Sequence, residues 1–128
     1  MTKKALIPAI LALLAITVAI PASAANTGDG FYENIATVAV DRAGVSMVDA
    51  TDLFLTRLVG SNYHPARMNG EEELTIHGRT MTTSQWYTLA YRLYEESWDD
   101  LVDGSYRRSM ILANRANAIF TKLLQEGR

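Results

Sequence analysis

The side chains with the strongest potential for chemistry are two histidines in one stretch of the chain. His64 precedes a proline, His77 precedes a glycine, and the acidic run 71–73 lies between them. Two imidazoles and one carboxylate can bind a metal ion, but no spacing in this segment imposes that geometry. The sequence also lacks a zinc-protease helix motif, a nucleophile elbow and a phosphate-binding glycine loop. We therefore predict no catalytic residue, no metal site and no cofactor.

A second chemically distinctive group is a stripe of aromatic side chains. Its members recur at spacings of four, three and four, which places them on one helix face. The aromatic stripe comprises Tyr87, Tyr91, Tyr94 and Trp98. Aromatic residues at helical spacing are typical of a core edge, and tyrosine and tryptophan are also favoured in protein-binding surfaces. The candidate partner-binding residues are this stripe together with Asn114 and Asn117 on the next helix.

The helix that carries the aromatic stripe has clear signals at its start. Thr82 and Gln85 have the spacing of a capping box, and Met81 and Trp86 have that of a hydrophobic staple. The pattern predicts a helix to about Val102.

A helix of equal length follows after the turn 103–105. Ser105 is its expected N-cap, and it should extend to about Gln125. The short connection predicts an antiparallel αα-hairpin. Acidic residues crowd the end of the first helix, and Arg107 with Arg108 opens the second. Because the helix dipole disfavours both placements, we expect the two groups to neutralise each other across the turn.

Two shorter helices are expected upstream. The apolar positions of the first are Phe31, Ile35, Val38 and Ala39. Gly44 should end it, and Ser46 should open a second, mostly apolar helix with Asp49 in a capping-box position. This second helix is expected deep in the core, with its end at Gly60.

Residues 60–81 read as a long irregular segment. Segments 74–76 and 79–81 could form a tiny hairpin around His77 and Gly78. The predicted fold class is therefore all-α: a small four-helix domain with two short helices, this irregular segment and a long helical hairpin.

The first 24 residues have the features of a cleaved signal peptide. A basic start is followed by an apolar run of 16 residues and by Ala22-Ser23-Ala24, a small-x-small cleavage motif. The run is shorter than the ~20 residues of a membrane-spanning helix. Cleavage between Ala24 and Ala25 would leave a single helical domain, 25–128, in the periplasm or outside the cell, with no stable membrane span.

The charge of that domain bears on its partners. It carries 10 basic and 14 acidic residues, a formal charge of −4, and has no cysteine. Nucleic-acid binding needs clustered basic side chains, so we expect no nucleic-acid partner. A core without disulfides must provide the stability alone.

One segment resembles a known family. Residues 81–85, Met-Thr-Thr-Ser-Gln, are similar to the Leu-Thr-x-x-Gln motif of small helical periplasmic chaperones. That family repeats the motif and carries a basic cradle, whereas this chain has the motif once and is acidic. The resemblance implies a chaperone role as one alternative.

The expected function is that of an exported, non-enzymatic helical interaction module. It would act as an accessory or adaptor protein of the bacterial cell envelope, and its partner would be another envelope protein or a second copy of the chain. Besides the chaperone role, the alternative is a periplasmic protein that binds a small ligand or a metal through residues 60–81.

Overall fold

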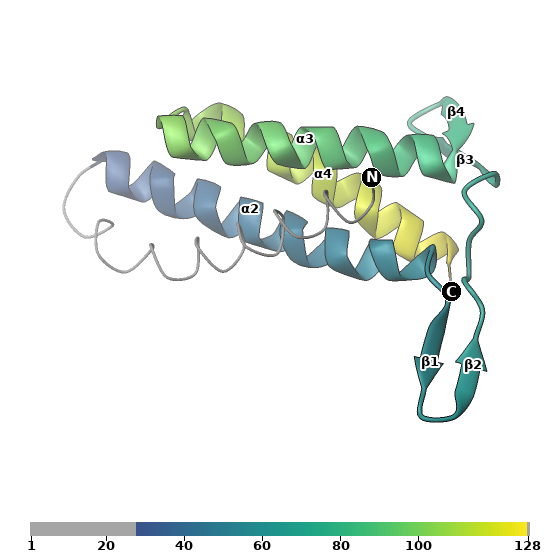
Figure 1. The fold of residues 1–128 in the computed structure, drawn as a ribbon. Helices are drawn as coiled ribbons and strands as arrows, with labels where there is room; N and C mark the ends of the chain where they lie inside the picture. The colour runs from purple at the N-terminus through teal and green to yellow at the C-terminus, as the bar shows by residue number, and fades with distance from the viewer. Residues whose placement is uncertain (1–27, 128) are drawn as a thin grey trace.

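Three helices and two short β-hairpins make up the part of the chain that the computed structural model describes, residues 28–127. In chain order the elements are α2 (Gly28–Leu53), β1 (Arg57–Val59), β2 (Asn62–His64), β3 (Glu73–Ile76), β4 (Arg79–Thr82), α3 (Thr83–Asp103) and α4 (Tyr106–Glu126) (Figure 1). The expected signal peptide and its cleavage site lie outside the described residues. Within 28–127, none of the helices has both the length and the apolar character that a membrane crossing requires.

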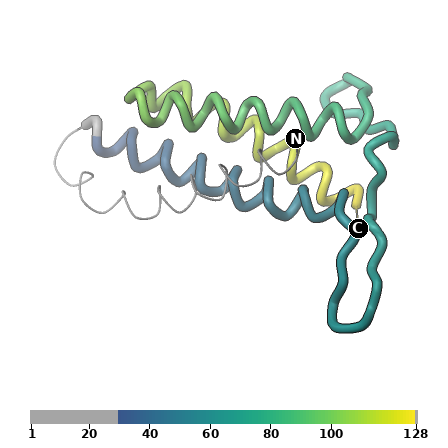
Figure 2. The backbone as a smooth tube through the Cα atoms, in the orientation of Figure 1, coloured from purple at the N-terminus to yellow at the C-terminus, as the bar shows by residue number. Residues whose placement is uncertain are grey.

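The three helices lie alongside one another, with both hairpins at one end (Figures 1 and 2). Helix α4 packs closely against both α2 and α3, whereas α2 and α3 contact each other much less. The α3–α4 pair is the antiparallel hairpin that the sequence predicted. The seam between α2 and α3 is therefore the loosest contact in the helical body.

The prediction of two short helices before residue 60 was wrong, because α2 is one continuous helix through Gly44. Residues on both sides of the glycine lie on one buried face, including Val40, Ala43 and Met47. A glycine costs about 1 kcal/mol in a helix interior, and burial of this continuous apolar face offsets that cost. Residues 28–127 accordingly contain three helices instead of the four that were expected.

The predicted end of the second helix at Gly60 was also wrong. Helix α2 ends at Leu53, and the next residues turn: the Phe54 and Leu55 amides donate to the carbonyls of Thr51 and Asp52 at 3.1 and 3.3 Å. Leu58 and Val59, expected in the core, lie in strand β1 and are exposed. The apolar run had extended the helical pattern beyond the point where the core ends.

The sequence predicted one of the two hairpins and missed the other. The β3–β4 hairpin confirms the expected pairing, and its two-residue turn places His77 and Gly78 at φ values of 51° and 78°. The β1–β2 hairpin was not predicted; it pairs Leu58 with Tyr63 around a turn in which Gly60 has a φ of 64°. At its base the Met68 amide donates to the Leu53 carbonyl at 2.9 Å, and the strands β1 and β2 with their turn project from the helical body (Figure 1).

Local signals set the ends of α3 and α4. The capping box is confirmed: the Gln85 amide donates to Thr82 Oγ1, and the Thr82 amide donates to Gln85 Oε1. Gly104 ends α3 in a left-handed conformation with a φ of 86°. Ser105 precedes α4 as expected, but its side chain makes no capping hydrogen bond.

Candidate functional site

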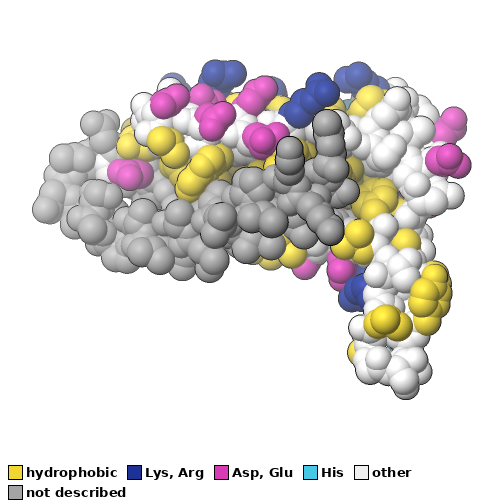
Figure 3. Space-filling model, in the orientation of Figure 1, with side chains coloured by type: hydrophobic (Ala, Val, Ile, Leu, Met, Phe, Trp, Pro, Cys, Tyr) yellow, Lys and Arg dark blue, Asp and Glu magenta, His cyan; other side chains and the backbone are white. Residues whose placement is uncertain are grey.

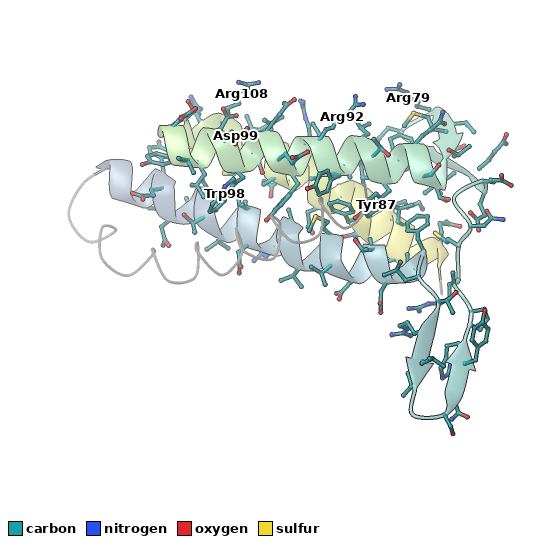
Figure 4. All side chains as sticks on the ribbon, in the orientation of Figure 1. Arg79, Tyr87, Arg92, Trp98, Asp99 and Arg108 are labelled. Carbon is teal, nitrogen blue, oxygen red and sulfur yellow. The ribbon has the colours of Figure 1, made fainter. Side chains whose placement is uncertain are left out.

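The aromatic stripe divides between core and surface. Tyr94 is only 2% exposed and belongs to the core, whereas Tyr87, Tyr91 and Trp98 are half-buried. Figure 4 shows Tyr87 and Trp98 extending from α3 toward α2, so these side chains fill the loose α2–α3 seam. The stripe therefore supplies packing first, with part of three side chains left accessible.

Tyr87 is the most firmly held of the accessible rings. Its ring lies edge-on to Phe54 and Phe120, with centroids 5.5 and 5.6 Å apart, and stacks on Tyr91 at 6.5 Å. Its hydroxyl shares a hydrogen bond with Thr51 Oγ1. Tyr87 thus joins α3 to both other helices and is a poor candidate for a contact that forms only on binding.

The environment keeps the phenols of the stripe neutral. Burial raises the pKa of Tyr94 to about 12, and neighbouring Tyr91 and Asp41 add to the effect. Burial also raises the pKa of Tyr91 to about 12, with a further contribution from Glu95 and Tyr87. Burial raises the pKa of Tyr87 as well, against an opposing hydrogen bond from Thr51. These groups are therefore unsuited to acid–base chemistry near neutral pH.

The two candidate asparagines have different environments. Asn117 accepts a hydrogen bond from the Ser46 hydroxyl and so helps to join α4 to α2. Asn114 is exposed and lines a hollow of about 260 Å³ between the same helices. Only Asn114 has the position of a surface contact.

A second exposed apolar feature, the α2 stripe, was missed by sequence reasoning. It consists of Phe31, Val38 and Val45, which are 62%, 44% and 48% exposed. Phe31 and Val38 had been assigned to the apolar positions of the first helix; the continuous α2 instead turns Ala36, Val40 and Ala43 inward. The seven-residue spacing of the three side chains was the available signal, because it puts them on one face.

The hollow beside Asn114 adjoins the α2 stripe. Its walls come from α2 and α4, namely Asn34, Ile35, Val38, Ala39, Arg42, Met110 and Asn114. Val38 thus belongs to both features. Together they form a shallow surface with an apolar floor and a rim of one arginine and two asparagines.

The strands of the β1–β2 hairpin carry the most exposed apolar feature of the described residues, next to the polar turn Gly60-Ser61. Leu58, Val59 and Tyr63 are 74%, 56% and 68% exposed. Figure 3 shows hydrophobic side chains on this projecting hairpin. Every residue of β1 and β2 is exposed, so the hairpin contributes nothing to the core.

The charged turn between α3 and α4 is partly as expected. Arg108 lies 3.5 Å from Asp100 and 3.9 Å from Glu96 across the turn. Arg107 makes no ion pair with a described residue. Because Asp100 is almost buried, Arg108 is the group that compensates its charge.

The two histidines do not form a common site. His64 lies in β2 and His77 in the turn of the other hairpin. Among residues 28–127 no group of three histidine, aspartate or glutamate side chains could hold a metal ion.

Of the acidic run, Glu72 has a structural role. Its carboxylate accepts hydrogen bonds from the Asn69 and Gly70 amides, both at 3.0 Å, and from the Thr83 hydroxyl at 2.9 Å. Burial alone would raise the pKa of Glu72, but backbone and side-chain hydrogen bonds outweigh it and hold the pKa below its ordinary value. The residue fastens the 69–72 segment to the start of α3.

Comparison of the chain with protein-family models, with curated proteins and with solved structures finds no match.

Proposed function

We propose that this chain is an exported, non-enzymatic interaction module that binds a helix of an envelope protein or of a second copy of itself. The observation that carries the proposal is the α2 stripe, three large apolar side chains at seven-residue intervals beside the 260 Å³ hollow. A cleaved signal peptide would bring the module to the cell envelope.

The spacing of the stripe determines the kind of partner it suits. Apolar residues seven apart follow one line along a helix, and a second helix can lie along that line. Helix-in-groove recognition uses such a line of apolar anchors with polar groups at the rim. Arg42, Asn34 and Asn114 supply those polar groups here. An exposed apolar line of this length on a small domain is typical of an interaction site.

The half-buried aromatic side chains support the same role at a second place. Tyr91 and Trp98 are accessible in the seam where α2 and α3 contact each other little. Tyrosine and tryptophan contribute disproportionately to binding energy when a partner covers them. They are secondary because they also pack within the domain.

The test replaces Val38 with aspartate and uses Val102→Asp as the matched control. Both valines lie on helices and are exposed, but Val102 is on α3 and does not belong to the α2 stripe. We expect Val38→Asp to retain the helical circular-dichroism signal. It should lose photo-crosslinking to envelope proteins from position 45 and any self-association in sedimentation. Crosslinking that persists in Val38→Asp, or that falls equally in Val102→Asp, would contradict this function.

Export is tested separately by N-terminal sequencing of the protein recovered from its native host. We expect the mature chain to begin at Ala25, because Ala22 and Ala24 supply the small residues that signal peptidase requires. Recovery of a chain that still begins with Met1 in the membrane fraction would contradict the proposed export as a free domain.

A further inference from the structure

The β1–β2 hairpin stands apart from the rest of the described chain in its exposure. Its base is closed by the hydrogen bond from Met68 to Leu53, and Met68 itself is buried. Beyond that base the strands contact each other but not the core, and the hairpin projects from the body (Figure 1). A projecting element with exposed apolar residues on its strands needs an explanation other than packing.

The apolar side chains lie on both faces of this hairpin. Leu58 and Tyr63 are directly opposed across the strands and share one face, whereas Val59 is paired with Asn62 and points to the other. A flat protein surface that docks onto one face of a two-stranded ribbon leaves the other face in water. A continuous apolar phase that surrounds the tip would cover both faces.

The charge of the hairpin segment also favours an apolar phase with a charged surface. Residues 53–70 contain no aspartate or glutamate, although the chain as a whole is acidic. They contain Arg57, which pairs with Asp52 at 2.8 Å, and Arg67, which makes no ion pair with a described residue. Both arginines lie nearer the base than the apolar side chains. Because Asp52 compensates Arg57, the segment's positive charge is that of Arg67, and an apolar outer part followed by this charge suits a lipid surface with anionic headgroups.

We propose that the β1–β2 hairpin docks this protein on the surface of an anionic lipid bilayer. Leu58, Val59 and Tyr63 enter the interfacial region, and Arg67 lies at headgroup level. Tyrosine is favoured at this depth because its ring is apolar and its hydroxyl stays hydrated. This contact is independent of the α2 stripe, so the module would bind a partner helix and a membrane with different elements.

The dimensions of the hairpin limit how deep it goes. Three residues of strand extend about 10 Å, which matches the depth of interfacial insertion. Both outer edges of the hairpin carry backbone groups without a strand partner, and these groups must remain near water. The contact is therefore shallow and reversible.

The test exploits the absence of cysteine, because Ser61→Cys then provides a single labelling site in the hairpin turn. Ser105→Cys, at another exposed turn on a different part of the molecule, is the matched control. Each variant is labelled with an environment-sensitive fluorophore and mixed with vesicles of phosphatidylcholine alone or of equal phosphatidylcholine and phosphatidylglycerol. We expect a blue shift at position 61, larger with the anionic vesicles, and no shift at position 105. No shift at position 61, or equal shifts at both positions, would overturn the proposal.

Two further variants test the chemistry in vesicle flotation. Replacing Leu58, Val59 and Tyr63 together with threonine keeps residues suited to a strand and should weaken binding at least about 10-fold. Arg67→Gln should weaken binding to anionic vesicles about five-fold, the effect of one basic residue near such a surface, with no effect on neutral vesicles. Ile111→Thr, an exposed apolar position on α4, is the control and should bind normally.

A protein partner for the hairpin would give a different result. A label at position 61 that responds to detergent-extracted envelope proteins but to neither vesicle type would overturn the lipid proposal. That outcome would leave the function proposed for the α2 stripe intact, because the Val38→Asp test does not involve the hairpin.

Discussion

Trp86 connects the helical core to the β3–β4 hairpin at the level of a single side chain. It is 4% exposed, and its indole N–H donates to the Leu74 carbonyl at 2.7 Å. The ring thereby fills the core while its polar edge satisfies a strand carbonyl. Trp98, the other tryptophan, is half-buried in the α2–α3 seam.

Replacing Trp86 with alanine should therefore cost about 3–5 kcal/mol of unfolding free energy, the usual range for a buried aromatic ring. Trp86→Phe should cost less, because it keeps most of the packing but removes the donor to Leu74. Trp98→Ala is the comparison and should be milder than Trp86→Ala. Urea denaturation measures all three, and equal losses for both alanine variants would be inconsistent with this difference in burial.

Glu72 makes stability depend on pH in a defined direction. Its pKa in the folded protein is below the ordinary value, so the unfolded chain binds a proton more readily on acidification. The stabilisation is complete above the ordinary carboxyl pKa and is lost as pH falls through the folded-state pKa. Glu72→Gln should therefore be less stable than the unmodified protein at neutral pH, with a gap that narrows in acid.

Glu71→Gln is the matched control for that titration. Glu71 is an exposed neighbour whose backbone, not its carboxylate, bonds to Asn69. Chemical denaturation across pH 3–7 should show a pH-dependent difference for the Glu72 variant only. A constant difference across this range would show that the carboxylate charge is not what matters.

At the scale of elements, the α3–α4 turn combines a left-handed glycine with a cross-turn ion pair. Gly104 reverses the chain, and the Ser105 amide donates to the Asp100 carbonyl at 2.8 Å. Arg108 then lies within reach of both Asp100 and Glu96. The ion pairs thereby offset the unfavourable interaction of the acidic groups with the α3 dipole and that of Arg108 with the α4 dipole.

Arg108→Glu should destabilise the protein by about 1 kcal/mol at low ionic strength, the upper end for ion pairs that solvent reaches, because Arg108 itself is exposed although Asp100 is not. The effect should shrink in high salt, because salt screens charges near the surface. Arg107→Glu is the control; it changes the same charge one residue away, where no ion pair with a described residue exists. A similar loss for both variants would indicate a general effect of charge.

The elements that the sequence predicted are those with a local signal. The capping box at Thr82 and Gln85 and the His77-Gly78 turn depend on neighbouring residues, and both form as expected. The predictions at Gly44 and at the largely apolar segment 53–59 were wrong, because whether a helix continues through such residues depends on packing. Helix α2 continues through Gly44 because α4 covers its face, and it ends at Leu53 although the helical pattern continues.

The candidate binding surfaces also depend on how the helices pack. The spacing of the aromatic stripe predicted one helix face, but whether each ring is buried depends on where α2 lies. The α2 stripe required a continuous helix, and the exposed hairpin required the helix to end early. None of these conditions is a local property of the sequence.

At the scale of the whole molecule, one core between three helices carries the stability. Its largest buried side chains include Tyr94, Phe120, Met47 and Leu123. A chelator should therefore leave the helical circular-dichroism signal and the Tm of the purified mature chain unchanged. A large fall in either would show that a metal contributes to the fold.

The projecting hairpin should also let the domain stay folded after its chain is cut there. Arg57 and Arg67 are exposed beyond the hydrogen bond that closes the hairpin base, so brief trypsin treatment should nick the protein there. The α2 fragment would still bury its apolar face against α4, and the two pieces should elute together until urea separates them. Replacement of the β1–β2 hairpin by another connection should therefore leave the helical core unchanged. The Leu53 side chain also lies against Gly127, so the C-terminal ends of α2 and α4 are neighbours, and a change in the link that follows Leu53 should leave this contact in place.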